Sequence, residues 1–502
     1  MLYACPYAGS CPPNFYKIKL FYNRKIFPNY ERKNAIIMVK IKFGTDGWRA
    51  IIAKEYTVDN VMRVADATAR WMLSKDMEAA VIGYDCRFAG AMFARATAEV
   101  LGAYGLRVYL ADHFASTPMV SYGVTQLKAD MGIVITASHN PPDYNGYKLK
   151  SSYGGPTIPA HINEVEEMIP DAAPGLLLPV KDMETKGLLK WVDLEEMYIE
   201  KIKNQFDLDL ILNSGIRIAY DAMFGAGQNV IKRLLPDAYL MHCDNNPSFL
   251  GTPPEPIEKN LIELAEVVAK DATIGMGLAT DGDADRIGLF DEFGRFVDSH
   301  RILLLLVHYL HHYKNMNGGV IITFSVTEKV KKLADHYGLP CEITKIGFKY
   351  ISEIMLVKDV LVAGEESGGI AIKGHIPERD GIWMGLVILE FMAKTGKSLS
   401  QLIDEIYEII GAFEFGRNDL HLTEAKKQDI LKKLDQKVFK NFGKYAITDF
   451  EDLDGYKYYF GADKWVMIRP SGTEPVLRVY AQGPDKMTVE QILSEVCAAI
   501  TA

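Results

Sequence analysis

An apolar segment that ends in a sharp polar turn constrains the fold of this chain more than any other feature. Residues 131–135 (MGIVI) are apolar and rich in β-branched side chains, which is typical of a strand covered on both faces. The following residues, 136–141 (TASHNP), carry Ser138 and lead into two prolines, which exclude regular secondary structure. The pattern predicts that Ser138 lies on an exposed turn, where its hydroxyl is placed to carry a covalent group. A serine that only caps a helix is an equally good interpretation of this segment alone.

A second apolar segment, residues 273–279 (TIGMGLA), is followed by an acidic turn. Its carboxylates stand at alternate positions, at Asp281, Asp283 and Asp285, and can converge on one hard cation such as Mg²⁺. The alternatives are a solvated acidic turn and a calcium loop. The calcium interpretation is weaker, because the long loop that ends in a bidentate glutamate is missing. Arg286 beside the three carboxylates suits a phosphate better than a metal alone.

Two further loops carry groups that suit a sugar phosphate. Residues 364–369 (GEESGG) follow an apolar strand candidate, and Glu365 and Ser367 suit hydrogen bonds to neighbouring sugar hydroxyls. Residues 465–475 (WVMIRPSGTEP) offer an arginine, hydroxyls and free backbone N–H groups, which form an anion nest suited to a phosphate that does not react. Each loop is weak evidence alone, but ordinary structural turns do not readily explain all of these groups in one chain.

These loops occur in an order that resembles the α-D-phosphohexomutase superfamily, the phosphoglucomutase and phosphomannomutase enzymes. The opening segment 43–49 (FGTDGWR) belongs to the same resemblance, which covers nearly everything from Lys42 to the C-terminus. It implies an α/β fold with three similar α/β domains, each with a mixed, largely parallel sheet. A smaller α+β C-terminal domain would complete a central cleft.

Length and periodicity agree with several domains, because 502 residues are too many for one core. Strand candidates alternate with helical stretches, such as 79–84, 89–104 and 106–110, as in βαβ units. We expect a helical stretch over 386–410 and a hinge at residues 411–412. The expected ranges are an extension outside the fold at 1–37, a phosphoserine domain at 38–185, a metal domain at 186–298, a sugar-binding domain at 299–411 and a phosphate-binding domain at 412–502.

Composition excludes some classes of function. The net charge of −9 argues against nucleic acid or an anionic membrane as a partner, and no apolar run approaches bilayer-spanning length. The six cysteines have no paired spacing, which predicts reduced thiols in a cytoplasmic protein. An anionic substrate would need a locally positive cleft, for which the candidates are Arg49, Lys148, Arg286, Arg379 and Arg469.

The resemblance implies a reaction. Ser138 would exist as phosphoserine, and its phosphate would share one Mg²⁺ per chain with Asp281, Asp283 and Asp285. The phosphoserine would pass its phosphoryl group to a hexose monophosphate, and glucose 1,6-bisphosphate would serve as intermediate and activator. The bisphosphate would turn over in the cleft and return its other phosphate, so that a 1-phosphate becomes a 6-phosphate.

The resemblance also implies roles for single residues. His139 and Lys148 are the acid and base candidates, although charge stabilisation is an equal interpretation of Lys148. Arg49 would neutralise charge beside the serine, and Glu365 and Ser367 would read the 3- and 4-hydroxyls. The residues expected to contact the substrate elsewhere are Arg286, His375 and Arg379, with Arg469, Ser471, Gly472 and Thr473 on the phosphate that does not react.

Substrate choice depends on few positions. Glu366 and Gly369 depart from the glucosamine phosphate branch, which typically has glutamine and histidine there, and Phe348 resembles the glucose branch. We therefore favour a phosphoglucomutase. A phosphomannomutase or dual-specificity mutase is the main alternative, and a phosphoglucosamine mutase, a phosphatase or a non-catalytic sugar-phosphate-binding homologue is less favoured.

Two other features are expected to be structural. His308, His311 and His312 fall at helical spacing, but the stretch 302–313 is an apolar helix, and a polar last turn explains the histidines without a metal. Arg87 we expect to brace its own domain.

Overall fold

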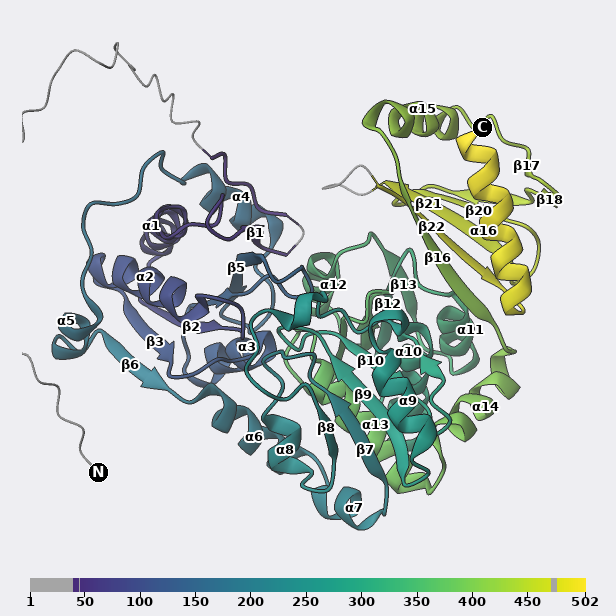
Figure 1. Cartoon of the computed structure of the whole chain (residues 1–502), viewed down its shortest axis with the longest axis horizontal. Coiled ribbons are helices and arrows are strands. Elements are labelled where there is room, and N and C mark those ends of the chain that lie inside the picture. Colours follow the sequence, from purple (N-terminus) through teal and green to yellow (C-terminus); the bar gives the residue numbers. More distant parts are fainter. Residues whose placement is uncertain (1–38, 45, 471–475) are drawn as a thin grey trace, which may run out of the picture. The chain divides into compact units, whose positions relative to one another are not determined.

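The computed structural model describes residues 39–44, 46–470 and 476–502 (Figure 1). The expected extension at 1–37 lies outside the described residues. Within the described part, four main sheets follow one another along the chain, three of them mixed and the last antiparallel. This confirms the predicted class of three α/β domains followed by a smaller C-terminal domain.

The first domain has a six-stranded sheet in the order β1-β5-β4-β2-β3-β6. Val81 of β2 and Val134 of β4 pack with α3, and their neighbours along the strands are buried as well, so the central strands are covered on both faces. Its strands are β1 Trp48–Ile51, β2 Ala79–Tyr84, β3 Arg107–Ala111, β4 Met131–Ile135, β5 Tyr144–Ser151 and β6 Leu189–Val192. Its helices are α1 Val58–Ser74, α2 Gly90–Ala103, α3 Thr117–Gln126, α4 Pro159–Glu167 and α5 Val180–Thr185.

The second domain begins with α6 and carries a five-stranded sheet in the order β11-β10-β9-β7-β8. Its helices are α6 Leu194–Gln205, α7 Leu208–Asn213, α8 Val230–Leu234 and α9 Ile262–Lys270. Its strands are β7 Arg217–Asp221, β8 Tyr239–Met241, β9 Ile274–Thr280, β10 Ile287–Phe290 and β11 Phe296–Val297.

The third domain has a four-stranded sheet in the order β13-β12-β14-β15. Its strands are β12 Gly319–Thr323, β13 Cys341–Thr344, β14 Val360–Gly364 and β15 Ile370–Ile372. Its helices are α10 Ser299–His308, α11 Glu328–His336, α12 Phe348–Met355, α13 Gly381–Thr395 and α14 Leu399–Ile410.

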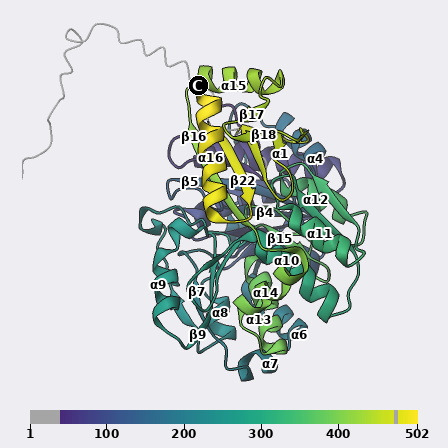
Figure 2. The same ribbon diagram turned by 90° about the vertical axis from the view of Figure 1, so that its right-hand side faces the viewer.

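The fourth domain is an antiparallel sheet in the order β16-β22-β21-β20-β19. Helix α16 lies against one face of this sheet (Figure 2), and its apolar side chains share a core with those of the strands. The elements are β16 Glu414–His421, α15 Glu424–Asp435, β17 Asn441–Phe442, β18 Tyr445–Ala446, β19 Asp449–Glu451, β20 Tyr456–Tyr459, β21 Trp465–Pro470, β22 Val476–Gly483 and α16 Lys486–Thr501.

The loops singled out by the sequence occupy one topological position in all three α/β domains. In each domain, the loop leaves the carboxyl end of a buried parallel strand and returns in the antiparallel strand beside it. The three strand pairs are β4–β5, β9–β10 and β14–β15. Because the carboxyl ends of parallel strands are where α/β sheets place their ligands, this repeated position brings the three loops to equivalent edges.

Two sequence-based expectations need correction. The expected boundary at 185/186 is too early, because β6 pairs in parallel with β3 and therefore completes the first sheet. The helical stretch expected over 386–410 is two helices, since Gly396 ends α13 in the left-handed conformation at φ 67°. Its first helix also starts earlier than expected, at Gly381, where the side chain of Asp380 caps it.

The histidines of α10 and the π-helical turn after it, Tyr309–Tyr313, have ordinary structural contacts. His308 is buried and its ring nitrogens lie 2.5 Å from the Tyr337 hydroxyl and 3.1 Å from a Glu405 carboxylate oxygen. His311 lies 3.0 Å from the carbonyl oxygen of Met316.

Asp380 gives a test of how the third domain is held. Its fully buried carboxylate caps α13 through the N–H of Trp383 and accepts the Tyr198 hydroxyl of α6 at 2.7 Å. Replacing Asp380 by Ala should lower the free energy of unfolding by about 3 kcal/mol, because a cap is lost and a buried hydroxyl is left unpaired. Denaturant unfolding measures this change.

The control for Asp380 is another capping residue. Thr423 caps the more exposed helix α15, so Thr423→Ala should lower the free energy of unfolding by only about 1 kcal/mol. Equal losses of unfolding free energy in the two variants would show that Asp380 stabilises the protein no more than an ordinary helix cap does.

Candidate active site

Ser138 lies on a turn whose backbone is fixed by its own neighbours. Its φ angle is 52°, a left-handed value that is uncommon outside glycine, and its N–H donates to the Thr136 hydroxyl at 2.8 Å. The Ser138 hydroxyl donates to Asp281 Oδ2 at 2.7 Å and lies 3.2 Å from His139 Nδ1. The nucleophile candidate and the acidic turn of the next domain are therefore in direct contact.

The sequence predicted an exposed turn, and this part of the prediction is wrong. Ser138 is only 1% exposed because the acidic turn of the second domain covers it. A Cβ atom at Gly282 would lie 2.5 Å from the Ser138 carbonyl oxygen, so only glycine permits this approach. The contact between two domains hides a hydroxyl that the local sequence leaves open.

Arg87 holds the serine turn from beneath. Its buried guanidinium donates to the carbonyl oxygens of Ser138, Asn140, Pro141 and Tyr144 at 2.6–3.0 Å. Asp85 lies 3.3 Å from the Arg87 Nε and accepts the Thr136 hydroxyl at 2.6 Å. These contacts add to the turn's own hydrogen bond, from the Asn140 N–H to the Ala137 carbonyl oxygen at 3.0 Å, and hold Ser138 in its left-handed conformation.

The acidic turn is curved around its first carboxylate. Asp281 Oδ1 accepts the N–H groups of Asp285 and Arg286 at 2.9 and 3.0 Å, and Ala284 takes a left-handed φ of 55°. The three aspartates are buried and offer ligand oxygens within 4.8 Å of one another.

Orphaned oxygens test whether this turn suits a cation. Within the described part of the chain, Asp283 Oδ1 and Asp285 Oδ1 are buried without a hydrogen-bond partner. Buried carboxylate oxygens without partners are rare, and they are the donors that a hard divalent cation prefers. The residues therefore fit a metal held by oxygen ligands.

Cations from two other domains surround the acidic turn. Lys148 of β5 lies 2.8 Å from Asp283, 3.2 Å from Asp285 and 2.8 Å from Asp46. Arg379, just before α13, lies 2.6 Å from Asp285 and also pairs with Asp46. Their positive charge offsets the repulsion between the carboxylates.

The pKa shifts follow from burial and from these charges. Burial, reinforced by Asp285 and Asp283, raises the pKa of Asp281 well above its usual range. Burial opposes ionisation of Asp283 as well, but Lys148 outweighs it and lowers the pKa of Asp283.

The acid and base candidates differ in protonation. Burial lowers the pKa of His139 well below its usual value, and Arg286 and Arg49 add to the effect. Burial alone would lower the pKa of Lys148, but Asp283, Asp285 and Asp46 raise it on balance. His139 is thus held neutral and Lys148 charged, which favours the charge-stabilising interpretation of Lys148.

The loop at residues 364–369, called the sugar loop below, lies between the second and third domains and carries the candidates Glu365 and Ser367. Glu365 is buried and accepts the Gly347 N–H at 2.8 Å, and burial raises its pKa. The backbone of Gly369 forms a bridge with Arg286 of the acidic turn. The acidic turn therefore meets both the serine turn and the sugar loop.

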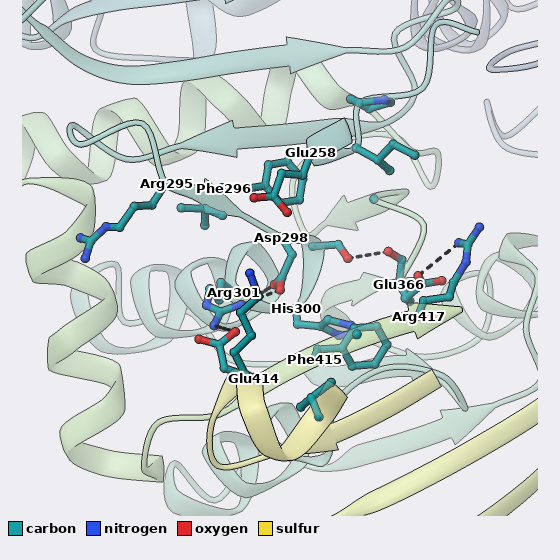
Figure 3. A pocket seen from close by; sticks show the side chains of 18 of the residues that line it. Glu258, Arg295, Phe296, Asp298, His300, Arg301, Glu366, Glu414, Phe415 and Arg417 are labelled. Carbon is teal, nitrogen blue, oxygen red and sulfur yellow. Dashed lines mark hydrogen bonds and ion pairs between the residues drawn. The ribbon is translucent and has the colours of Figure 1, made fainter. Parts of the chain in front are cut away.

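Ser367 lines a cavity of about 1020 Å³. Residues of the second, third and fourth domains form its walls. Figure 3 shows Glu366 and Arg417 side by side at one edge of the cavity, where they form an ion pair at 3.6 Å. Glu366 is thus paired with an arginine of β16.

The remaining predicted residues are placed as follows. Arg49 donates to the Asn140 side chain of the serine turn at 2.7 Å. The side chain of His375 is fully buried, lies 2.8 Å from the Asp380 carboxylate and stacks on Trp383, so its described contacts face α13 and not the acidic turn. Arg469 pairs with Asp454 at 3.2 Å. Ser471, Gly472 and Thr473 lie outside the described residues.

Sequence reasoning missed Asp46, and it gave Arg87 no link to the serine. Asp46 lies in the opening segment that carried the resemblance, but its spacing says nothing of its contact with Lys148. Asp85 and Arg87 follow β2, which pairs in parallel with β4, the strand before Ser138. Because the ends of adjacent parallel strands lie side by side, polar residues after both strands could have predicted that Arg87 lies close to the serine turn.

Four family models match the chain in order. They are domains I, II and III of phosphoglucomutase/phosphomannomutase, over residues 40–174, 196–294 and 298–410, and its C-terminal domain, over residues 421–499. Each model covers most of one sheet, and together they leave out β6, β11 and all of β16 except its last residue.

Individual relatives agree. A phosphoglucomutase/phosphomannomutase of Thermococcus kodakarensis is 30% identical over 90% of this chain and 96% of its own length. A phosphoglucosamine mutase of Caldicellulosiruptor bescii is also 30% identical, over 88% of this chain and 95% of its own. A crystal structure from Thermus thermophilus, provisionally assigned as a phosphomannomutase, is 32% identical with a TM-score of 0.82, over 93% of this chain and all of that one.

These matches identify the chain as a phosphohexomutase, an isomerase that acts on sugar phosphates. The chain belongs to the phosphoglucomutase/phosphomannomutase group of the α-D-phosphohexomutase superfamily. None of its described helices is long and apolar enough to cross a membrane.

The contacts of Arg87 predict a large effect on turnover. Arg87→Ala should lower kcat by about 100-fold, because displacement of a reacting group by about 1 Å has an effect of that size. Arg87→Lys should give an intermediate value, since a lysine cannot reach all the carbonyl oxygens. Steady-state kinetics measure both.

Arg107, an exposed arginine of the same domain that pairs with Glu78, is the matched control. Arg107→Ala should leave kcat unchanged. A kcat for Arg87→Ala equal to that of Arg107→Ala would show that the serine turn needs no support from Arg87.

The raised pKa of Asp281 predicts how metal affinity depends on pH. Below that pKa, Asp281 holds a proton that the metal must displace, so affinity for Mg²⁺ or Mn²⁺ should fall as the pH falls. Titration calorimetry between about pH 5 and about pH 8 measures the slope. Asp281→Asn should weaken binding and flatten the slope, whereas an affinity of the unaltered protein that does not change with pH would contradict the prediction.

Proposed function

We propose that the protein interconverts the 1-phosphate and 6-phosphate of a hexose, with glucose as the preferred sugar, through phosphoserine at Ser138. The observation that carries the proposal is the 2.7 Å contact of the Ser138 hydroxyl with Asp281, in a turn that also carries orphaned carboxylate oxygens. A nucleophile beside a metal site is the arrangement that phosphoryl transfer requires.

The metal site would be formed by Asp281, Asp283, Asp285 and the phosphate on Ser138. Mg²⁺ bound there would supply positive charge to stabilise the transferring phosphoryl group. The protein adds Lys148 and Arg379 beside the same carboxylates and Arg49 beside the serine turn.

In the transfer, the bond between phosphorus and Ser138 Oγ breaks and a bond from phosphorus to the sugar oxygen forms. The sugar hydroxyl loses its proton and Ser138 Oγ gains one. His139 supports this proton exchange, because its Nδ1 lies 3.2 Å from Oγ and its lowered pKa leaves it neutral. Lys148 stays charged and stabilises the phosphate.

The bisphosphorylated sugar, glucose 1,6-bisphosphate, would be the intermediate and, when added, the activator. The site must hold it in two orientations, so one phosphate site serves either end. Arg469, Ser471, Gly472 and Thr473 are proposed for that site, and Glu365 and Ser367 for the sugar hydroxyls. Arg286 and His375 remain proposed substrate contacts.

The preference for glucose rests on Glu366 and Gly369, which depart from the glucosamine phosphate branch, and on Phe348, which resembles the glucose branch. A mutase that acts on mannose phosphates, or on both sugars, is the second candidate, because glucose and mannose differ only at C2. The relatives carry the names phosphoglucomutase/phosphomannomutase and phosphoglucosamine mutase at similar identity, so the names alone do not separate the substrates.

A reducing compartment, the cytoplasm, suits the protein. Four cysteines lie in the described part, and each is a free thiol: Cys86, Cys243, Cys341 and Cys497. Their thiols would persist where glutathione and thioredoxin keep cysteines reduced.

Turnover of the 1-phosphates of glucose, mannose and glucosamine, with Mg²⁺ and a trace of the matching 1,6-bisphosphate, tests the proposal. We expect the glucose compound to react fastest and to give glucose 6-phosphate without free phosphate. Ser138→Ala should lower the rate by at least about 10³-fold, because it removes the group that carries the phosphoryl.

Mass spectrometry after incubation with glucose 1,6-bisphosphate should show a phosphate on the peptide that contains Ser138. Release of free phosphate as the main product would indicate a phosphatase. A faster reaction of glucosamine 1-phosphate would overturn the preference while leaving the mutase mechanism intact.

A further inference from the structure

One carboxylate, Asp454, joins the third and fourth domains at the proposed substrate site. Its Oδ2 accepts the N–H of Ile346, which follows β13 of the third domain, at 2.8 Å. The same carboxylate binds Arg469 of the fourth domain through Nε at 3.2 Å and Nη2 at 3.3 Å. One edge of the Arg469 guanidinium therefore binds the Asp454 carboxylate, which also accepts a hydrogen bond from the third domain.

The next peptide group continues this connection. The N–H of Gly347 donates to Glu365 Oε1 at 2.8 Å, beside the N–H of Ile346 that donates to Asp454. Two adjacent amides thus bind two carboxylates, one from the fourth domain and one from the sugar loop. Arg469 and Glu365 are therefore connected through hydrogen bonds to Asp454 and to the adjacent amides of Ile346 and Gly347.

The local fold keeps Asp454 beside Arg469. Strands β20 and β21 pair with Tyr456 opposite Ile468, which places the preceding residue, Gly455, against Arg469. Gly455 has a φ of 116°, and a Cβ atom there would lie 2.9 Å from the Ile468 carbonyl oxygen. Only glycine allows the turn to press this closely on β21.

The pair is accessible enough to meet a ligand. The side chains of Asp454 and Arg469 are 23% and 22% exposed, so water and solutes reach them. An ion pair of this exposure contributes little to stability by itself, which leaves positioning as its main effect. The described contacts of Arg469 use Nε and Nη2, and a phosphate would approach the other edge.

We propose that Asp454 is a positioning residue that orients Arg469 for the distal phosphate of the substrate and ties it to the loop that carries Glu365. The inference rests on the proposed function, in which Arg469 binds the phosphate and Glu365 the sugar. Binding at one end of the hexose phosphate then restrains the group that reads the other end. Neither the spacing of Asp454 nor its residue type marks it as a site residue.

The test is a double-mutant cycle. Asp454→Ala should lower kcat/KM for the best hexose 1-phosphate by about 10-fold to 100-fold, mostly through a raised KM, since binding of the phosphate that does not react is lost. In a protein that already carries Arg469→Ala, the further change Asp454→Ala should have almost no effect. A cycle with Glu365→Gln should also be non-additive, whereas a role in folding alone would give additive losses.

Asp452, two residues earlier in the same loop, is the matched control. Its side chain is 65% exposed and its ion pair with Lys437 is long, at 3.9 Å, so Asp452→Ala should leave both kinetic constants unchanged. Asp454→Asn should restore part of the loss, because an amide oxygen can still accept the N–H of Ile346. Equal kinetics for Asp454→Ala and Asp452→Ala, or additive losses with Arg469→Ala, would overturn the proposal.

A binding measurement separates this inference from the proposed function. Calorimetric titration of the wild-type protein with inorganic phosphate should give an affinity that Asp454→Ala weakens several-fold and Asp452→Ala does not. If the wild-type protein turned over no hexose phosphate but the phosphate affinity still depended on Asp454, the function would fail and the positioning role would stand. Phosphate affinity unaffected by Asp454→Ala would remove the positioning role.

Discussion

Three buried aspartates, Asp281, Asp283 and Asp285, lie within reach of a single cation, and charges from two other domains hold them there. Like charges this close repel strongly where water is excluded, and removal of one partner from a buried ion pair is strongly destabilising. Lys148 comes from the first domain and Arg379 from the third. The cations that offset the repulsion within the acidic turn therefore come together only when the three domains are assembled, so the same ion pairs that build the site also join the domains.

A repeated topology supplies the other half of the arrangement. In three successive domains, the chain leaves a buried parallel strand, forms a polar loop and returns in an antiparallel strand. One loop carries the serine, one the carboxylates and one the sugar-reading candidates. The acidic turn contacts both of the others, through Ser138 and through the bridge between Arg286 and Gly369. The second domain is thus the centre of the site, and Asp454 extends the same connectivity to the fourth domain.

Much of this could be predicted from local sequence. Buried strands and the loops that follow them are short-range patterns, and they located Ser138, the aspartates and Glu365 within the correct strand ends. The strand β6 was assigned to the wrong domain because its partner β3 lies about 80 residues earlier, and no local pattern reports a parallel pairing. The prediction that Ser138 is exposed was wrong for a similar reason, since Gly282, which packs against it, belongs to another domain.

The sequence by itself determined which chemical groups the chain offers and at which strand ends they stand, because residue type and hydrophobic periodicity are local properties. Only the tertiary structure decided which of these groups meet and in what protonation state. Arg87 became the support of the serine turn because the turn folds its carbonyl oxygens toward β2, and His139 became neutral because burial and neighbouring cations act on it together. Contacts and pKa values depend on what surrounds a side chain in space, and folding brings those surroundings from distant parts of the chain.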